Sequence, residues 1–163
     1  MKIGIIADTH DETDQLQAAL EILRAEGVKT LLHCGDVCGT HLLRALEGFD
    51  VWIAQGNMDG DFKLTQAVEE VFGQGRLAWL QRPALDGTSV AMLHGDNEEA
   101  LQNLVASGEY AYVFHGHTHR RRDQTVGRTR IINPGPLGGR HPQRYSFCIL
   151  DLDTGEARFV ELE

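Results

Sequence analysis

The sequence has few cysteines and no pattern that would pair them. Its 163 residues include three, Cys34, Cys38 and Cys148, and an odd, widely spaced set does not form a disulfide framework. Such sparse usage is typical of a reducing compartment. Cys34 and Cys38 also lack the second pair of ligands that a structural zinc site requires. We therefore expect buried thiols rather than disulfides or a structural zinc site.

The sequence also has no segment with the length of a membrane span. A single lysine precedes strand-like residues at its start, without the apolar region and cleavage site of a secretory signal. No apolar stretch approaches the roughly 20 residues that a membrane helix needs. We therefore expect a cytoplasmic protein with no membrane partner.

Positive charge is scarce as well. Fifteen Lys and Arg residues stand against 24 Asp and Glu, which gives a formal net charge of −9. Sequence-independent binding to nucleic acid needs basic patches that neutralise phosphates, so this balance argues against such a partner. The one basic run, three arginines at residues 120–122, follows candidate site residues directly. A solvated hairpin edge is a simpler explanation of this run than substrate binding.

The composition is otherwise that of an ordinary globular protein. A hydrophobic fraction of 42% and a charged fraction of 24% exclude general disorder. A chain of 163 residues can bury one full core but is short for two domains with a linker. We expect a single domain over residues 1–163. The 18 glycines exceed the usual share, and many follow apolar runs, which predicts tight turns there.

Hydrophobic periodicity predicts alternating strands and helices in the first third of the chain. Apolar runs at residues 3–7, 30–34 and 51–55 predict buried strands. Leucines at helical spacing predict one helix between the caps at residues 11–14 and Gly27, and another over about residues 40–46. This alternation is typical of parallel strands joined by right-handed crossovers.

The second half of the chain is richer in strands. Short strand-like runs between about residues 77 and 93 include a hairpin signal at Asp86-Gly87, and a helix over 97–106 and a strand over 110–114 follow. Further strands are expected near residues 124–126, 129–132, 145–150 and 157–162, in an antiparallel arrangement. Two packed sheets with helices on their outer faces would accommodate all of these elements.

Side chains that bind metals follow five of these apolar runs. The carboxyl ends of strands are where open α/β sheets place their ligands. Two of the ends carry a pair of such residues two positions apart, and an extended segment would present both side chains of each pair on the same side. The seven candidate metal ligands are Asp8, His10, Asp36, Asn57, His94, His117 and His119.

Each of these residues also has a simpler explanation when it is taken alone. Asp8 would serve as a helix cap, Asp36 and Asn57 each follow a glycine as turn residues often do, and His94 would suit a loop. Their coincidence at five strand ends favours a joint metal site. Imidazole and carboxylate ligands suit manganese, iron, nickel or zinc better than copper(I), and several histidines argue against magnesium or calcium alone. Seven ligands exceed the needs of one tetrahedral ion, so two ions sharing a carboxylate are expected.

The ordered motifs resemble those of the calcineurin-like metallophosphoesterases. They are Asp8-x-His10, Gly35-Asp36, Gly56-Asn57-x-Asp59, His94-Gly95-Asp96 and Gly116-His117-x-His119. The short length, the Asn-x-Asp form and the Asn-Pro-Gly of residues 133–135 resemble most the small single-domain bacterial and archaeal phosphodiesterases. The resemblance covers about residues 1–135. It implies an α/β fold, a four-layer α/β/β/α sandwich of two mixed β-sheets flanked by helices, with a dinuclear site between the ends of the sheets.

The same resemblance assigns ligands to each of two divalent ions, with manganese the first choice and nickel, iron(II) or zinc the alternatives. One ion takes Asp8, His10, Asp36 and His119, and the other takes Asp36, Asn57, His94 and His117. Asp36 is then the bridging ligand, and an activated hydroxide rather than a side chain is the nucleophile. As catalytic residues we expect Asn57, whose amide lies near the developing charge, and Asp59, which together with Asp96 is a candidate for orienting a ligand histidine.

The sequence departs from the family pattern at two positions. Many relatives carry a histidine directly after the motif asparagine, where it is thought to protonate the leaving group, but this chain has Met58. A thioether cannot donate a proton, so the general acid is unassigned and good leaving groups are favoured. Pro136 replaces the serine that often follows Asn-Pro-Gly, in a turn expected to flank the site. Beyond it, Arg140 and His141 are candidates for contact with phosphate, although an exposed loop is the simpler reading.

These observations predict a metal-dependent phosphoesterase, most simply a phosphodiesterase that hydrolyses a small soluble phosphate ester. The alternatives are a phosphomonoesterase, a nucleotide-pyrophosphate hydrolase, or a catalytically weak scaffold like the retromer subunit that shares this fold. Complete ligand positions favour an enzyme. Relatives often form oligomers, and an exposed Trp52 or Trp79 would support a homo-oligomer.

Overall fold

The computed structural model describes residues 1–140 and 144–163, and these residues form two mixed β-sheets. The first sheet has six strands in the order β11-β10-β1-β2-β3-β4. Strands β1 to β4 are mutually parallel, and β10 and β11 extend the sheet antiparallel beyond β1. The strands are β1 (Lys2–Ile6), β2 (Thr30–His33), β3 (Asp50–Ala54), β4 (Leu77–Ala78), β10 (Ser146–Asp151) and β11 (Ala157–Glu161).

The second sheet has five strands in the order β5-β6-β7-β9-β8. Its centre is parallel, because β7 pairs parallel with both β6 and β9. The antiparallel arrangement expected for the later strands is therefore correct for β8, β10 and β11 but wrong for the pairing of β9 with β7. The strands are β5 (Leu80–Gln81), β6 (Val90–Leu93), β7 (Tyr112–Phe114), β8 (Arg122–Val126) and β9 (Thr129–Asn133).

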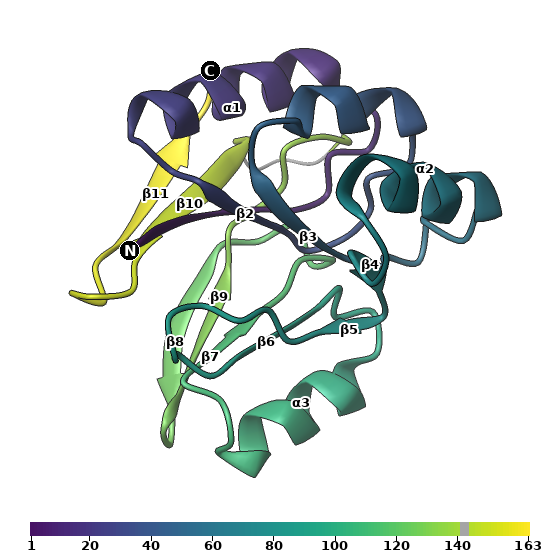
Figure 1. Ribbon diagram of the computed structural model, residues 1–163. Helices are drawn as coiled ribbons and strands as arrows, with labels where there is room; N and C mark the ends of the chain where they lie inside the picture. The colour runs from purple at the N-terminus through teal and green to yellow at the C-terminus, as the bar shows by residue number, and fades with distance from the viewer. Residues whose placement is uncertain (141–143) are drawn as a thin grey trace.

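The helices cover the two outer faces of the paired sheets. Helices α1 (Thr13–Ala25) and α2 (Phe62–Phe72), with the 3-10 helix η1 (Thr40–Leu46), lie over the first sheet, and α3 (Glu98–Ser107) lies under the second (Figure 1). This is the predicted four-layer α/β/β/α sandwich. In the part of the chain that the structure describes, none of the helices combines the length and the apolarity needed to cross a bilayer.

Each boundary between layers contains its own hydrophobic core. Ile3 and Ile5 of β1 point into the core between the sheets, whereas Ile6 packs with the helices. Gly4 lies on the helix side, where a β-carbon would come within 2.8 Å of Leu23 of α1. The strand is thus buried on both faces, as the apolar run predicted, and α1 packs directly on its backbone.

Two helical segments differ from the sequence prediction. Residues 40–46 form a 3-10 helix and not an α-helix. Helix α2 was not predicted, although Leu64 and Val68 are buried at four-residue spacing and Asp61 caps the helix by accepting a hydrogen bond from the Lys63 N–H. This missed helix joins β3 to β4 and lies directly after the loop that contains Asn57 and Asp59.

Candidate metal centre

Five of the seven predicted ligands have a left-handed backbone. The residues and their φ angles are Asp8 (53°), His10 (44°), Asp36 (56°), His117 (66°) and His119 (54°). Strands β1 and β7 have already ended at Ile6 and Phe114, so the pairs two positions apart are not held together by the alternation of an extended segment, as the sequence analysis assumed. Left-handed backbone is rare for side chains of this kind, and such strain clusters at functional sites.

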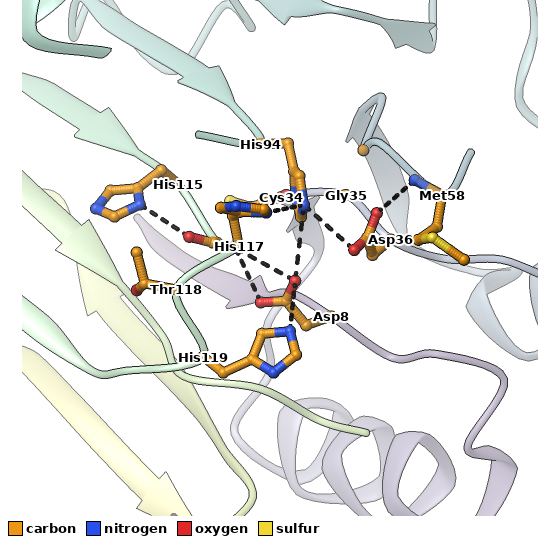
Figure 2. Close-up of polar contacts among 12 residues, drawn as sticks. Asp8, Cys34, Gly35, Asp36, Met58, His94, His115, His117, Thr118 and His119 are labelled. Atoms are coloured by element: carbon orange, nitrogen blue, oxygen red, sulfur yellow. Dashed lines mark hydrogen bonds and ion pairs between the residues drawn. The ribbon is translucent and has the colours of Figure 1, made fainter. Parts of the chain in front are cut away.

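The carboxylate of Asp8 lies at the centre of the cluster and is fully buried. Its two oxygens accept hydrogen bonds of 3.2 and 3.1 Å from the main-chain N–H of His117. Oδ1 lies 3.5 Å from Nε2 of His119 and 3.9 Å from Nε2 of His94 (Figure 2). Asp8 therefore ties the end of the first sheet to two loops of the second.

Asp36 performs a similar role beside it. Its Oδ1 accepts a hydrogen bond of 3.0 Å from the main-chain N–H of Met58, and its Oδ2 lies 3.3 Å from Nε2 of His94. The same Oδ2 is 3.7 Å from Nε2 of His10. Asp36 thus faces one histidine from each of the two predicted ligand sets.

The imidazoles converge in pairs on this centre. Nε2 of His10 and Nε2 of His119 are 3.2 Å apart, and Nε2 of His94 lies 3.3 Å from Nδ1 of His117. Nδ1 of His94 is directed to the main-chain carbonyl of Cys34 at 2.8 Å, which directs Nε2 toward the carboxylates. Converging ring nitrogens and carboxylate oxygens are the donors that divalent transition metals prefer, so the residues present fit the implied ions.

Two groups of these side chains have the spacing of metal ligands. In each group one ligand atom per residue lies within 4.8 Å of the others, and the groups are Asp8, His10, His119 and Asp8, Asp36, His94. The residue common to both groups is Asp8, whereas the family resemblance assigned the bridge to Asp36. The Asn57 side chain is exposed on the loop between β3 and α2, in the turn beside Asp36. The complete ligand assignment stays a prediction.

The electrostatics of the cluster couple its acids and bases. Burial would lower the pKa of His94, but its bonds to the Asp36 carboxylate and the Cys34 carbonyl raise that pKa to about 9. The bond to Asp8 likewise raises the pKa of His119. Burial would raise the pKa of Asp36, yet the bonds from His94 and the Met58 N–H hold it below its usual value. In the metal-free protein, protons occupy ring nitrogens that a cation would need.

Asp59 supports the site through the backbone of its neighbours. Its Oδ2 accepts hydrogen bonds from the N–H groups of Asp36 (2.7 Å) and Gly56 (2.8 Å), and its Oδ1 accepts one from the N–H of Cys38 (2.9 Å). Asp59 and Asp96 were both candidates for orienting a ligand histidine. The hydrogen bonds of the Asp59 carboxylate hold the Asp36 turn, and Asp96 is exposed. The role of either residue in orienting a histidine stays a prediction.

His33 and Thr9 form a buried support that the sequence analysis missed. Nδ1 of His33 accepts a hydrogen bond of 3.1 Å from the Gly35 N–H, and its Nε2 lies 3.2 Å from the Thr9 hydroxyl. That hydroxyl donates to the carbonyls of Asp36 and Val37. Burial lowers the pKa of His33 to about 4, so the ring is neutral. A histidine at the end of an otherwise apolar strand was the available signal.

Asn133, the last residue of β9, and residues 134–139 after it lie against the loops that carry His10 and His117. Asn133 donates hydrogen bonds to the Gly116 carbonyl (2.9 Å) and the Thr118 hydroxyl (3.0 Å), which flank His117. A β-carbon on Gly138 would come within 1.9 Å of the Thr9 carbonyl oxygen, so only glycine permits this contact. The expected turn flanking the site is therefore present, and it braces both histidine loops.

The other charged residues near the motifs are Arg140, His141 and the basic run at residues 120–122. Arg140 is exposed, directly after Gly139, whose Cβ position would lie 3.3 Å from the His10 ring. His141 lies outside the described residues. Arg120 is exposed, while Arg121 pairs with Glu161 at 2.6 Å, which agrees with a solvated edge for the basic run.

The three thiols are unpaired in the structure. Cys34 and Cys148 are buried, as expected, but Cys38 is only half-buried, with its Sγ 3.7 Å from Nδ1 of His10. Burial and the nearby carboxylates raise the pKa of Cys38 to about 12, so it is a thiol at neutral pH. In the metal-free protein this position therefore holds the less nucleophilic thiol form.

Comparison with known proteins agrees with the fold and the motifs. The model of the calcineurin-like phosphoesterase superfamily domain matches residues 1–155. The chain belongs to this superfamily, as its motifs predicted. It is 32% identical over 166 residues to a phosphodiesterase from Methanocaldococcus jannaschii, and the alignment covers 100% of each chain.

Solved structures show the same architecture. The structure of an archaeal phosphodiesterase superposes with a TM-score of 0.90 at 32% identity and covers 99% of this chain and 100% of its own. More distant structures share the fold. Zinc-bound Vps29 from Entamoeba histolytica has a TM-score of 0.73 at 20% identity and covers 99% of this chain and 98% of its own. The Escherichia coli phosphoesterase YfcE has a TM-score of 0.69 at 18% identity, with 100% of each chain covered.

Proposed function

We propose that this protein is a metal-dependent phosphodiesterase that hydrolyses a small soluble phosphate ester in the cytoplasm, with manganese as the first choice of metal. The observation that carries the proposal is the convergence of Asp8 and Asp36 with His10, His94 and His119, and of the His117 ring with His94, at one end of the two sheets. The phosphodiesterase at 32% identity over the whole chain supports the diester class.

The described side chains provide ligands and supports rather than a nucleophile of their own. The Thr9 hydroxyl is buried and bonded to the main chain, and the Cys38 thiol stays protonated at neutral pH. Two divalent ions held by Asp8, Asp36 and the surrounding histidines would supply Lewis acidity and an activated water. The chain's own part is to hold these donors in place, which the left-handed turns and the Asp59 carboxylate do.

The Asn57 amide and the Met58 side chain occupy the tip of the turn beside Asp36. From this position Asn57 is proposed both to complete the ligand set and to place an amide near the charge that develops on the phosphoryl oxygens. Asp59, which holds the same turn, acts as a positioning residue for Asp36. A homo-oligomer stays part of the prediction, and 46% exposure of Trp79 favours it.

The test is hydrolysis of bis(4-nitrophenyl) phosphate and of 4-nitrophenyl phosphate by metal-stripped protein. Manganese, nickel, zinc or magnesium is then restored one at a time. We expect activity to return with a transition metal, to favour the diester, and to disappear in Asp36→Ala and His117→Ala. His41→Ala is the matched control, because His41 is an exposed histidine outside the predicted ligand set.

Each other outcome corresponds to one of the alternatives. Preference for the monoester would indicate a phosphomonoesterase, and cleavage of a nucleotide anhydride alone would indicate a pyrophosphate hydrolase. Protein that holds two metal ions per chain but hydrolyses none of these compounds would reject an enzyme of this class and favour a scaffold.

A further inference from the structure

The turn beside Asp36 presents an apolar side chain at the edge of a polar site. In the described part of the chain, the large hydrophobic residues that are exposed are Met58, Phe62, Val71, Trp79 and Val126. Two of these five lie within one short stretch, with Met58 58% exposed and Phe62 77% exposed. Met58 is the one bonded to the candidate metal centre, through its N–H and Oδ1 of Asp36.

The exposure of Met58 is imposed by the turn that carries it. The Asp59 N–H donates to the Gly56 carbonyl at 3.1 Å, and the Asp59 carboxylate accepts from the Gly56 N–H at 2.8 Å. Asp59 is fully buried, so the turn is anchored from below and residues 57 and 58 form its outward tip. Gly56 packs closely on Asp36, since a β-carbon there would come within 2.2 Å of Oδ1. Met58 is therefore held at a fixed place beside the site.

The position of this side chain sets what it can contact. Figure 2 shows Met58 next to Asp36, on the far side of that carboxylate from Asp8. An ester whose phosphate lies among the carboxylates and histidines, and which has a substituent extending past Asp36, would bring that substituent to this thioether. Methionine forms favourable contacts with aromatic rings and offers no strong hydrogen bond to a hydroxyl-rich group.

We propose that Met58 is a specificity-determining residue that favours phosphate esters with a flat aromatic group, such as an aryl ring or a nucleobase, beside the scissile phosphate. This inference rests on the proposed function, because it assumes that the ester binds at the candidate metal centre. Phe62, the first residue of α2, extends the exposed apolar stretch along the chain.

The test compares the binding of phenylphosphonate and methylphosphonate to manganese-loaded protein by isothermal titration calorimetry. Neither compound has a hydrolysable ester bond, so the measurement does not depend on turnover. A sulfur–aromatic contact of about 0.3–1.5 kcal/mol corresponds to a preference of roughly 2- to 12-fold for the phenyl compound in the wild type. Met58→Gln, of similar size but polar, should lose this preference. Met58→Leu, which is apolar but has no sulfur, should keep only the part that does not depend on the thioether. Val126→Ala, which changes an exposed apolar residue on β8, should leave it unchanged.

The outcomes separate the inference from the function on which it rests. If both phosphonates bind equally well to the wild type, or if Met58→Gln keeps the full phenyl preference, the role of Met58 is rejected while phosphate binding stands. If neither phosphonate binds to protein shown by metal analysis to hold manganese, the proposed function fails, and the inference fails with it.

Discussion

The carboxylate of Asp59 accepts a hydrogen bond of 2.7 Å from the main-chain N–H of Asp36. Asp59 is fully buried, and each of its oxygens is used by the backbone of the turns that carry Asp36 and Met58. The Asp59 carboxylate thus supports the left-handed backbone at Asp36, whose own side chain faces His10 and His94. The position of Asp36 therefore depends on Asp59, whose carboxylate accepts hydrogen bonds from main-chain N–H groups.

Asp59→Asn should weaken metal binding and leave the protein folded but less stable. An amide replaces one acceptor oxygen with a donor, which would face an N–H group and leave it unpaired. Losing a partner that orients a metal ligand typically lowers metal affinity about 10- to 100-fold, and a buried unpaired group costs about 1–3 kcal/mol of the free energy of unfolding.

Manganese affinity by calorimetry and thermal unfolding of the metal-free protein measure these two effects. Asp61→Asn is the matched control, because Asp61 is two residues away and caps α2, a position where asparagine serves equally well. Unchanged metal affinity in Asp59→Asn would contradict the positioning role.

Metal binding at neutral pH should release protons. The bonds to Asp36 and Cys34 raise the pKa of His94 to about 9 despite its burial, so the metal-free ring is protonated at pH 7.5. A histidine that holds a metal must give up the proton of its ligating nitrogen, so metal held by His94 would release that proton. We expect about one proton released from His94 when the ion binds, falling toward zero as the pH rises above 9.

The release is measured by titrating manganese into the metal-free protein in buffers with different ionisation enthalpies. His94→Asn should reduce the number of protons released, and His41→Asn should leave it as in the wild type. An observed heat that does not depend on the buffer at pH 7.5 would contradict this prediction.

The candidate site residues could be selected because they follow apolar runs that local periodicity reveals. His94 and His117 were selected in this way, and the structure places their rings side by side. The packing of β1 on both faces was predicted from the same pattern. The supports could not be predicted, because they join distant parts of the chain. The close contact of Gly138 with the Thr9 carbonyl depends on the packing of residues 137–138 against the loop that follows β1, which no local pattern reveals.

The left-handed turns were missed for a related reason. Alternation in an extended strand was the simplest way to bring His117 and His119 together, yet both lie beyond the end of β7 with positive φ. Backbone strain of this kind is tolerated only where the surrounding structure enforces it, here through the bonds from the His117 N–H to Asp8. Helix α2 was not predicted, although Leu64 and Val68 have the four-residue spacing of a buried helix face.

His33 should make the metal-free protein less stable in mild acid. Its pKa is lowered by burial from 6.5 to about 4, so below pH 6.5 the unfolded chain takes up a proton that the folded protein does not. The free energy of unfolding therefore falls as the pH falls through this window, by about 3 kcal/mol for this residue when the titration is complete. Above pH 6.5 the contribution is fully present.

Urea unfolding between pH 4 and pH 7.5 provides the measurement. His33→Gln is neutral throughout and should flatten the pH dependence, whereas His41→Gln should follow the wild type. Parallel curves for the wild type and His33→Gln would show that His33 is not the group responsible.

Met58→His should improve the hydrolysis of esters with poor leaving groups. The family resemblance implies that a histidine after the motif asparagine protonates the departing oxygen, and the methionine present here has no proton to donate. The structure places this side chain exposed beside Asp36, so an imidazole would have room there. General acid catalysis contributes about 10²–10⁴-fold, and a ring without evolved supports should recover at least about 10-fold of it in kcat.

Bis(4-nitrophenyl) and diphenyl phosphate are the paired substrates, since both carry aryl groups and differ mainly in the basicity of the departing oxygen. The gain in kcat of Met58→His should appear with diphenyl phosphate and be absent with bis(4-nitrophenyl) phosphate. Met58→Gln should show no gain with either ester. An equal gain on both esters would mean that the histidine acts by binding or by holding the metal, and not by proton transfer.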